Sequence, residues 1–151
     1  MDVTLGSTAI TISNNMVPGP WQGHDDSFSL DKNMKVTVVF NRLGPNINQR
    51  MPRIRRGFAH VVNDVYEGWE EYRIGGSMNA SVLSEGNLFI ASEKKKKKAT
   101  LRMPGKGANA WNWRSENDGF DNGAFFKEVR VVKARPAYRK HRSFWLGMLG
   151  K

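Results

Sequence analysis

A tripeptide pattern recurs along the first 92 residues: an Asn or Asp, then any residue, then an apolar residue. The instances that close short apolar runs begin at Asn15, Asn41, Asp64 and Asn87, so they start 26, 23 and 23 residues apart. A period of about 20–50 residues is typical of repeat architectures, in which each unit stacks on the next. Because strong helical periodicity is hard to find here, the pattern favours a parallel β-solenoid over helical repeats. Four chance occurrences of a common tripeptide are the alternative interpretation.

Short runs rich in β-branched and apolar residues predict strands at 9–13, 36–40 and 58–62. In a solenoid, the equivalent strands of successive coils pair in parallel, and each coil adds an inward apolar residue to a stack. An Asn repeated at the same turn can bond to the backbone of neighbouring coils, which satisfies buried polar groups in series. The sequence therefore predicts an all-β domain built from stacked coils.

Composition and charge limit the classes of function. The 151 residues contain no Cys, which excludes disulfides, thiolate metal sites and a cysteine nucleophile. No apolar run is long enough for a membrane helix, and no signal peptide is visible at the N-terminus, so we expect no membrane partner. The net charge is +10, yet residues 1–92 hold eight basic and nine acidic residues. The positive charge therefore belongs to a lysine run and to the C-terminal tail.

These two basic segments allow more than one interpretation. Residues 94–98 are consecutive lysines, which form either a solvated loop between two strands or a patch that binds a polyanion. The tail, residues 127–151, carries eight basic residues with aromatic residues between them. No signature of a known nucleic-acid-binding fold accompanies the tail, so we expect no specific nucleic-acid partner. If the tail did bind nucleic acid, deletion of residues 127–151 would remove the affinity.

An arginine cluster lies just before the third predicted strand, within the segment 49–57. Its members are Arg50, Arg53, Arg55 and Arg56. In an extended segment alternate side chains share a face, so Arg53 and Arg55 are predicted to point to the same side. Guanidinium groups offer a fork of donors that fits carboxylates and phosphates. The cluster is therefore either a site for an acidic polymer or a surface loop paired with the acidic residues at 25, 26, 64 or 67.

Several segments together identify a family that the chain resembles. They are Gly6 to Asn15, Gly23 to Phe28, Gln49 to Gly57, His60 to Asn63, Ile74 to Ser77, Trp111 to Ser115 and Asn122 to Phe126. In order and in sequence they resemble the C-terminal half of the plant pectate lyases. The resemblance runs from Asp2 to about Phe126, which is most of the chain.

The resemblance implies a fold and a domain organisation. It predicts a right-handed parallel β-helix of about four coils in residues 1–126, followed by an irregular, divergent basic tail at 127–151. Four aromatic residues are expected to pack a C-terminal segment across the solenoid. They are Trp111, Trp113, Phe125 and Phe126. We expect a monomer, and by resemblance an extracellular location in the cell wall.

The resemblance also implies an activity and its residues. Family members cleave polygalacturonate, the acidic polymer of pectin, by calcium-dependent β-elimination. Arg50 opens the family's Arg-x-Pro-Arg motif and is the expected catalytic base, while Arg55 is expected to bind the uronate carboxylate. Arg53 belongs to the same motif and is expected to support substrate binding. Asp2 corresponds to an aspartate of the family's calcium site, and calcium takes hard oxygen ligands of this kind.

One departure from the family bears on activity. The other calcium-binding carboxylates of the family lie upstream of the position that Met1 occupies here. One carboxylate is a poor site for an ion that takes about 6–8 oxygen ligands, so we expect weak or no turnover from this chain alone. The alternative function is a non-catalytic binder of acidic polysaccharide or another polyanion, which would use the arginine cluster and the lysine run. Substitution Arg50→Lys separates the two, since it should abolish turnover and barely alter salt-sensitive binding.

Overall fold

The computed structural model describes residues 9–14, 29–45, 47–103 and 111–129, and these form twelve strands and one short 3-10 helix. No α-helix occurs among these residues. The strands are β1 Ile10–Ser13, β2 Lys35–Val39, β3 Arg42–Leu43, β4 Arg53–Arg55, β5 Phe58–Val62, β6 Val65–Glu67, β7 Ile74–Ser77, β8 Ser81–Glu85, β9 Leu88–Ile90, β10 Thr100–Met103, β11 Asn112–Glu116 and β12 Gly119–Asp121. The 3-10 helix, η1, spans Ser29–Asn33.

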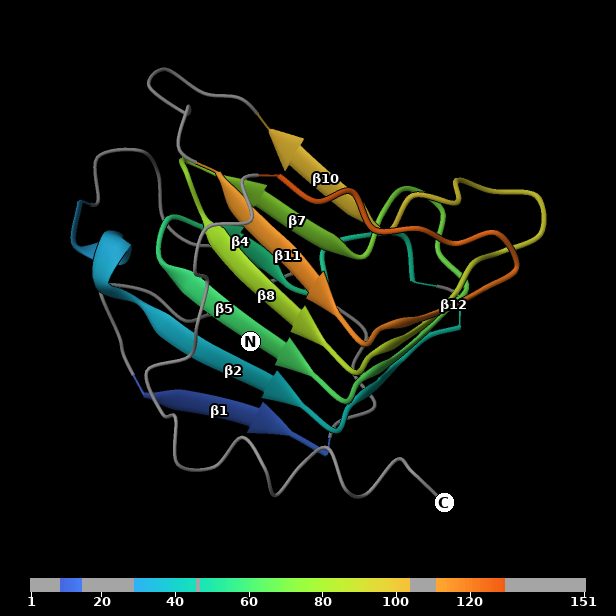
Figure 1. Ribbon diagram of the computed structural model, residues 1–151, viewed down its shortest axis with the longest axis horizontal. Coiled ribbons are helices and arrows are strands. Elements are labelled where there is room, and N and C mark those ends of the chain that lie inside the picture. The colour runs from blue at the N-terminus through green and yellow to red at the C-terminus, as the bar shows by residue number, and fades with distance from the viewer. Residues whose placement is uncertain (1–8, 15–28, 46, 104–110, 130–151) are drawn as a thin grey trace.

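The strands form three parallel sheets, which are the faces of a solenoid of stacked coils (Figure 1). The sheet orders are β1-β2-β5-β8-β11, β10-β7-β4 and β12-β9-β6-β3. Every pairing between strands of successive coils is parallel, and Lys35 of β2 pairs with Phe58 of β5, 23 residues later. The predicted all-β parallel solenoid is confirmed, and so are the strands expected at 9–13, 36–40 and 58–62. Three coils are complete within the described residues, with β1 below them and β11 and β12 above.

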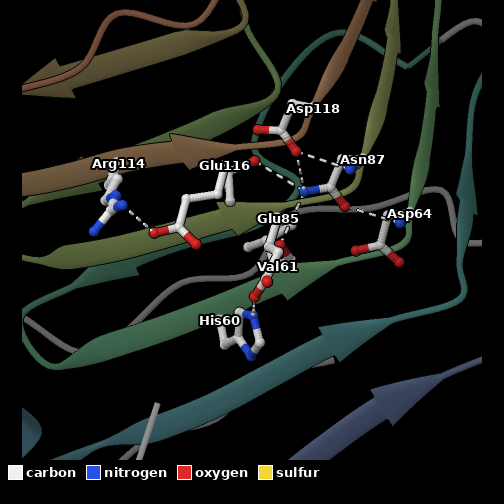
Figure 2. Close-up of polar contacts among 9 residues, drawn as sticks. His60, Val61, Asp64, Glu85, Asn87, Arg114, Glu116 and Asp118 are labelled. Carbon is white, nitrogen blue, oxygen red and sulfur yellow. Dashed lines mark hydrogen bonds and ion pairs between the residues drawn. The ribbon is translucent and has the colours of Figure 1, made fainter. Parts of the chain in front are cut away.

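The recurring Asn or Asp forms a ladder along one corner of the solenoid (Figure 2). The amide N–H of Asn41 donates to Asp64 Oδ1 at 2.7 Å, and the amide N–H of Asp64 donates to Asn87 Oδ1 at 2.8 Å. The amide N–H of Asn87 donates in turn to Asp118 Oδ1 at 2.8 Å. Asn15 lies outside the described residues. The ladder satisfies buried backbone donors coil by coil, as the repeat predicts.

The turn before each ladder residue needs a left-handed backbone. Phe40, Asn63, Gly86 and Asn117 immediately precede the four described ladder positions, with φ of 57°, 53°, 64° and 54°. Glycine adopts this region without steric cost, and asparagine tolerates it better than most residues. This requirement explains why three of the four positions are Asn or Gly, and it fixes the sharp corner between the sheet β1-β2-β5-β8-β11 and the sheet β12-β9-β6-β3.

Apolar side chains stack inside the coils in the same register. Tyr66, Phe89 and Phe120 occupy equivalent positions on β6, β9 and β12, and their rings stack at centroid distances of 4.8 and 5.5 Å. Tyr66 and Phe89 are fully buried, whereas Phe120 at the end of the stack is 42% exposed. Each coil therefore buries the aromatic face of the coil beside it.

The C-terminal segment crosses the last coil, as expected. Val129 pairs antiparallel with Trp113, and Phe125 pairs with Lys98. Trp113 is buried, and its Nε1 donates to the Ala80 carbonyl at 2.8 Å. Packing of Trp111, Trp113 and Phe126 is confirmed. The expectation for Phe125 is wrong, because this ring is 47% exposed.

The outward position of Phe125 follows from the extended backbone of its segment. Ala124 on one side is buried, and Phe126 on the other packs against the core, so the residue between them faces solvent. The expected boundary between residues 126 and 127 stays a prediction. Residues 130–151 lie outside the described part of the chain.

Candidate functional site

The arginine cluster lies on and beside β4. Arg53 and Arg55 are in the strand, Arg50 precedes it and Arg56 follows it. Ile54 points into the solenoid and is 9% exposed, while Arg53 and Arg55 on either side are half-buried on the outer face. The predicted alternation of the two arginines is therefore confirmed. In the next coil their pairing partners on β7 are Gly75 and Ser77.

Gly75 makes room on this outer face for an aromatic ring. A Cβ added to Gly75 would overlap the Tyr72 ring, whose Cζ would be 3.0 Å away, so Tyr72 lies directly over the glycine. Arg53 Nη2 donates to Met103 Sδ of β10 at 3.4 Å. The Arg53 side chain thus reaches from β4 across β7 to β10. Tyr72 is one of the groups that change the pKa of Arg53.

The charges of the cluster act on one another. Burial lowers the pKa of Arg53, and the positive charge of Arg50 lowers it further. Arg55 lowers the pKa in the same sense, while Tyr72 raises it. The guanidinium groups of Arg50 and Arg55 are therefore both close enough to Arg53 to be felt electrostatically.

Arg50 occupies the turn before β4 with a left-handed backbone, φ 73°. Among the described residues its side chain makes no hydrogen bond or ion pair, and its Nε is buried without a partner. The acidic residues proposed as surface partners are engaged elsewhere. Asp64 bonds to Asn41 in the ladder, and Glu67 pairs with Arg42 at 2.8 Å. Pairing of the cluster with Asp64 or Glu67 is therefore wrong, and the residues at 25 and 26 lie outside the described part.

The predicted calcium ligand, Asp2, also lies outside the described residues. Within the described ranges, no group of three or more His, Asp or Glu side chains is arranged to hold a metal ion. Calcium binds through about 6–8 oxygen ligands, so this part of the chain does not fit a calcium ion by itself.

The lysine run lies beside acidic residues of the preceding coil. Lys95 pairs with Glu70 at 3.7 Å, and Lys96 pairs with Glu71. Lys97 Nζ donates to the Ser92 carbonyl at 2.7 Å. These contacts favour the solvated-loop interpretation over a polyanion patch, because two of the five lysines already pair with carboxylates.

A second polar cluster, buried on β5 and β8, was not predicted from the sequence. His60 Nε2 lies 3.0 Å from Glu85 Oε2, and both side chains are less than 8% exposed (Figure 2). Sequence reasoning also missed Tyr72 and Arg73 next to the arginine cluster. The glycine at 75 was an available signal for Tyr72, since a glycine inside a strand often marks a close approach.

Comparison with known proteins places this architecture in a family. The family model for pectate lyase matches residues 1–134. The chain belongs to the pectate lyase family. It is 46% identical over 150 residues to probable pectate lyase 4 of Arabidopsis thaliana, a match that covers 95% of this chain and 40% of that protein. It is 47% identical over 152 residues to pectate lyase 1 of Juniperus virginiana, covering 95% of this chain and 41% of that protein.

A solved structure agrees with this assignment. The crystal structure of Jun a 1, the major allergen from cedar pollen, superposes with a TM-score of 0.82 at 49% identity, covering 91% of this chain and 42% of that chain. The chain therefore spans about two fifths of the length of these relatives. None of its described helical segments is long and apolar enough to cross a membrane.

Proposed function

We propose that this chain carries the arginine part of a pectate lyase site and cleaves polygalacturonate by β-elimination. The observation that carries the proposal is the state of Arg50. Its guanidinium makes no ion pair with a described carboxylate, although it lies near enough to Arg53 to lower the pKa of that guanidinium. An arginine held without a carboxylate partner is suited to an acidic polymer, which supplies negative charge.

Each arginine has a distinct role in this proposal. Arg55, on the outer face of β4, binds the carboxylate of a uronate residue. Arg53, held against Met103, supports the same substrate face. The neutral form of Arg50 takes the proton from C5, the C5–H electron pair becomes the C4=C5 double bond, and the oxygen on C4 leaves and takes a proton from solvent.

Calcium is part of the proposal through the family. The ion would bind substrate carboxylates and acidify the C5 proton, and Asp2 is the one ligand that we assign to this chain. The carboxylates of the described residues do not form such a site. We place the protein in the cell wall, where its substrate would be found, and we propose that it acts as a monomer.

The test measures the unsaturated uronate product spectroscopically, with polygalacturonate and calcium as reactants. The full chain should give a weak but measurable rate, and Arg50→Lys should lower the rate at least a hundredfold, since a lysine ammonium cannot replace the positioned guanidine. Salt-sensitive binding of polygalacturonate should change less than threefold. Arg42→Lys is the matched control, because Arg42 of β3 pairs with Glu67 of β6, on a different sheet from β4.

The outcomes separate the two candidate functions. A rate that depends on Arg50 supports the lyase. Binding without any product from the full chain would overturn the lyase proposal and leave a non-catalytic binder of acidic polysaccharide. Equal rates from the wild type and Arg50→Lys would refute the role assigned to Arg50.

A further inference from the structure

Arg73 immediately precedes β7 and is fully buried, although no carboxylate among the described residues pairs with it. Its guanidinium instead donates to backbone carbonyls and packs over the Trp69 ring at 5.6 Å from the ring centroid. Burial lowers the pKa of Arg73 to about 10. A buried arginine without a counter-ion is unusual, so the contacts that it makes call for an explanation.

The two terminal nitrogens of Arg73 reach two different coils. Nη2 donates to the carbonyls of Glu67 and Gly68 at 2.6 and 2.7 Å, within its own coil. Nη1 lies 3.4 Å from the Ile47 carbonyl and 3.8 Å from Met51 Sδ, both in the preceding coil. Residues 47–51, which we call the Arg50 loop, are thus contacted at both ends by one guanidinium.

The backbone around Arg73 joins the same segments. The Met51 N–H donates to the Arg73 carbonyl at 2.6 Å, and the Arg73 N–H donates to the Ala99 carbonyl of the following coil at 2.8 Å. Arg50 itself holds a left-handed φ of 73°, a conformation that non-glycine residues keep only when their surroundings impose it. Residue 73 supplies side-chain and backbone contacts to the residues on both sides of Arg50.

We propose that Arg73 is a positioning residue: its guanidinium ties the Arg50 loop to the turn at 67–68 and so fixes where the Arg50 side chain projects. This inference rests on the proposed lyase function for its catalytic consequence, but the clamp itself can be measured without turnover. A planar fork with separate donors can serve two loops at once, which a lysine ammonium or an apolar side chain cannot do. The arrangement explains why a cation is buried here.

The first measurement is amide hydrogen exchange in the full chain, and it needs no activity. In Arg73→Met, which keeps the volume and loses the donors, exchange at residues 48–51 should accelerate at least tenfold, while exchange in β5 should change less than threefold. Arg102→Met is the matched control, because Arg102 also donates to a backbone carbonyl, that of Lys127 at 3.3 Å. The control should leave the Arg50 loop unchanged. Unaltered exchange at 48–51 in Arg73→Met would overturn the clamp.

The second measurement is the kinetic split in the lyase assay. Arg73→Met should lower kcat at least tenfold and change KM less than threefold, because the substrate carboxylate is bound by Arg55 on the strand. Equal acceleration of exchange in β5 would show a merely structural role and refute the proposal. If Arg73→Met does not fold, Arg73→Lys serves the same test, since it keeps the cation over Trp69. A wild-type chain without turnover would refute the lyase function and leave the exchange experiment to decide the clamp.

Discussion

Asp64 is the one acidic rung between two Asn rungs of the ladder, and substituting it should change how stability depends on pH. Burial raises the pKa of Asp64 to about 7 from 3.8, although hydrogen bonds from the backbone and side chain of Asn41 oppose the rise. Asp64 Oδ2 is buried without a described partner in hydrogen-bond geometry, and the nearby Tyr66 hydroxyl, like Asn41, opposes the rise in the pKa. The charged form is therefore the unfavourable one in the folded protein.

The sign of the effect follows from proton binding. Between the unfolded pKa and about 7 the folded protein holds a proton that the unfolded chain has lost, so the stability that this group contributes is complete below pH 4 and is lost as the pH rises through 7. At about 1.4 kcal/mol per pH unit, the loss by pH 8 is about 4 kcal/mol. Asp118, whose pKa burial also raises, adds to the same trend.

Asp64→Asn removes this penalty and adds a donor in the right place. Asn41 Nδ2 donates to the Ile12 carbonyl and Asn87 Nδ2 to the Val61 carbonyl, at 3.1 and 2.9 Å. Val38 is the residue in register with both, so an amide at position 64 would meet the Val38 carbonyl. We expect the variant to match the wild type near pH 4 and to be up to about 4 kcal/mol more stable at pH 8.

Urea unfolding followed by tryptophan fluorescence at pH 4.5, 6 and 8 measures the difference. Asp121→Asn is the control, because Asp121 is exposed at the end of β12 and should give the same stability change at every pH. A stability difference between the wild type and Asp64→Asn that is equal at pH 4.5 and pH 8 would refute the reasoning.

Three further predictions concern packing, surface charge and the metal. Gly76→Ala places a Cβ 2.5 Å from Trp113 Cζ2, so it should destabilise the protein by about 1–3 kcal/mol in thermal unfolding; an unchanged Tm would contradict the packing. Glu71→Gln releases Lys96 and should increase salt-sensitive retention on immobilised polygalacturonate, with less than about 1 kcal/mol change in stability. Removing calcium with a chelator should stop product formation and leave the Tm unchanged, whereas a lower Tm would reveal a structural ion.

The repeat was enough to predict the stacking of coils because a solenoid satisfies its polar groups and buries its apolar groups at one fixed period. Asn41, Asp64 and Asn87 are 23 residues apart, and they occupy successive rungs. Asp118 was not predicted as a ladder residue because the last coil is longer than the others. Ser81 of β8 pairs with Asn112 of β11, 31 residues later. Its own tripeptide, Asp-Gly-Phe, fits the recurring pattern and could have revealed the fourth rung.

Features of the site that depend on neighbouring residues could be predicted from the sequence, whereas contacts between coils could not. The shared face of Arg53 and Arg55 was predictable because strand alternation is a property of neighbouring residues. The clamp by Arg73 was not, because a long side chain that reaches from one coil to the next leaves no mark in the sequence around it. The position of Tyr72 over Gly75 lies between these cases, since the glycine signals a close approach without naming its partner.

The most direct test of the catalytic assignment is a crystal structure of Arg50→Lys grown with calcium and an oligogalacturonate, in which the bound sugar survives. The account predicts a uronate carboxylate against Arg55, with its C5 within about 3.5 Å of the point that the wild-type Arg50 guanidinium would reach. A sugar bound along the lysine run, or with its C5 on the far side of β4 from position 50, would contradict the account.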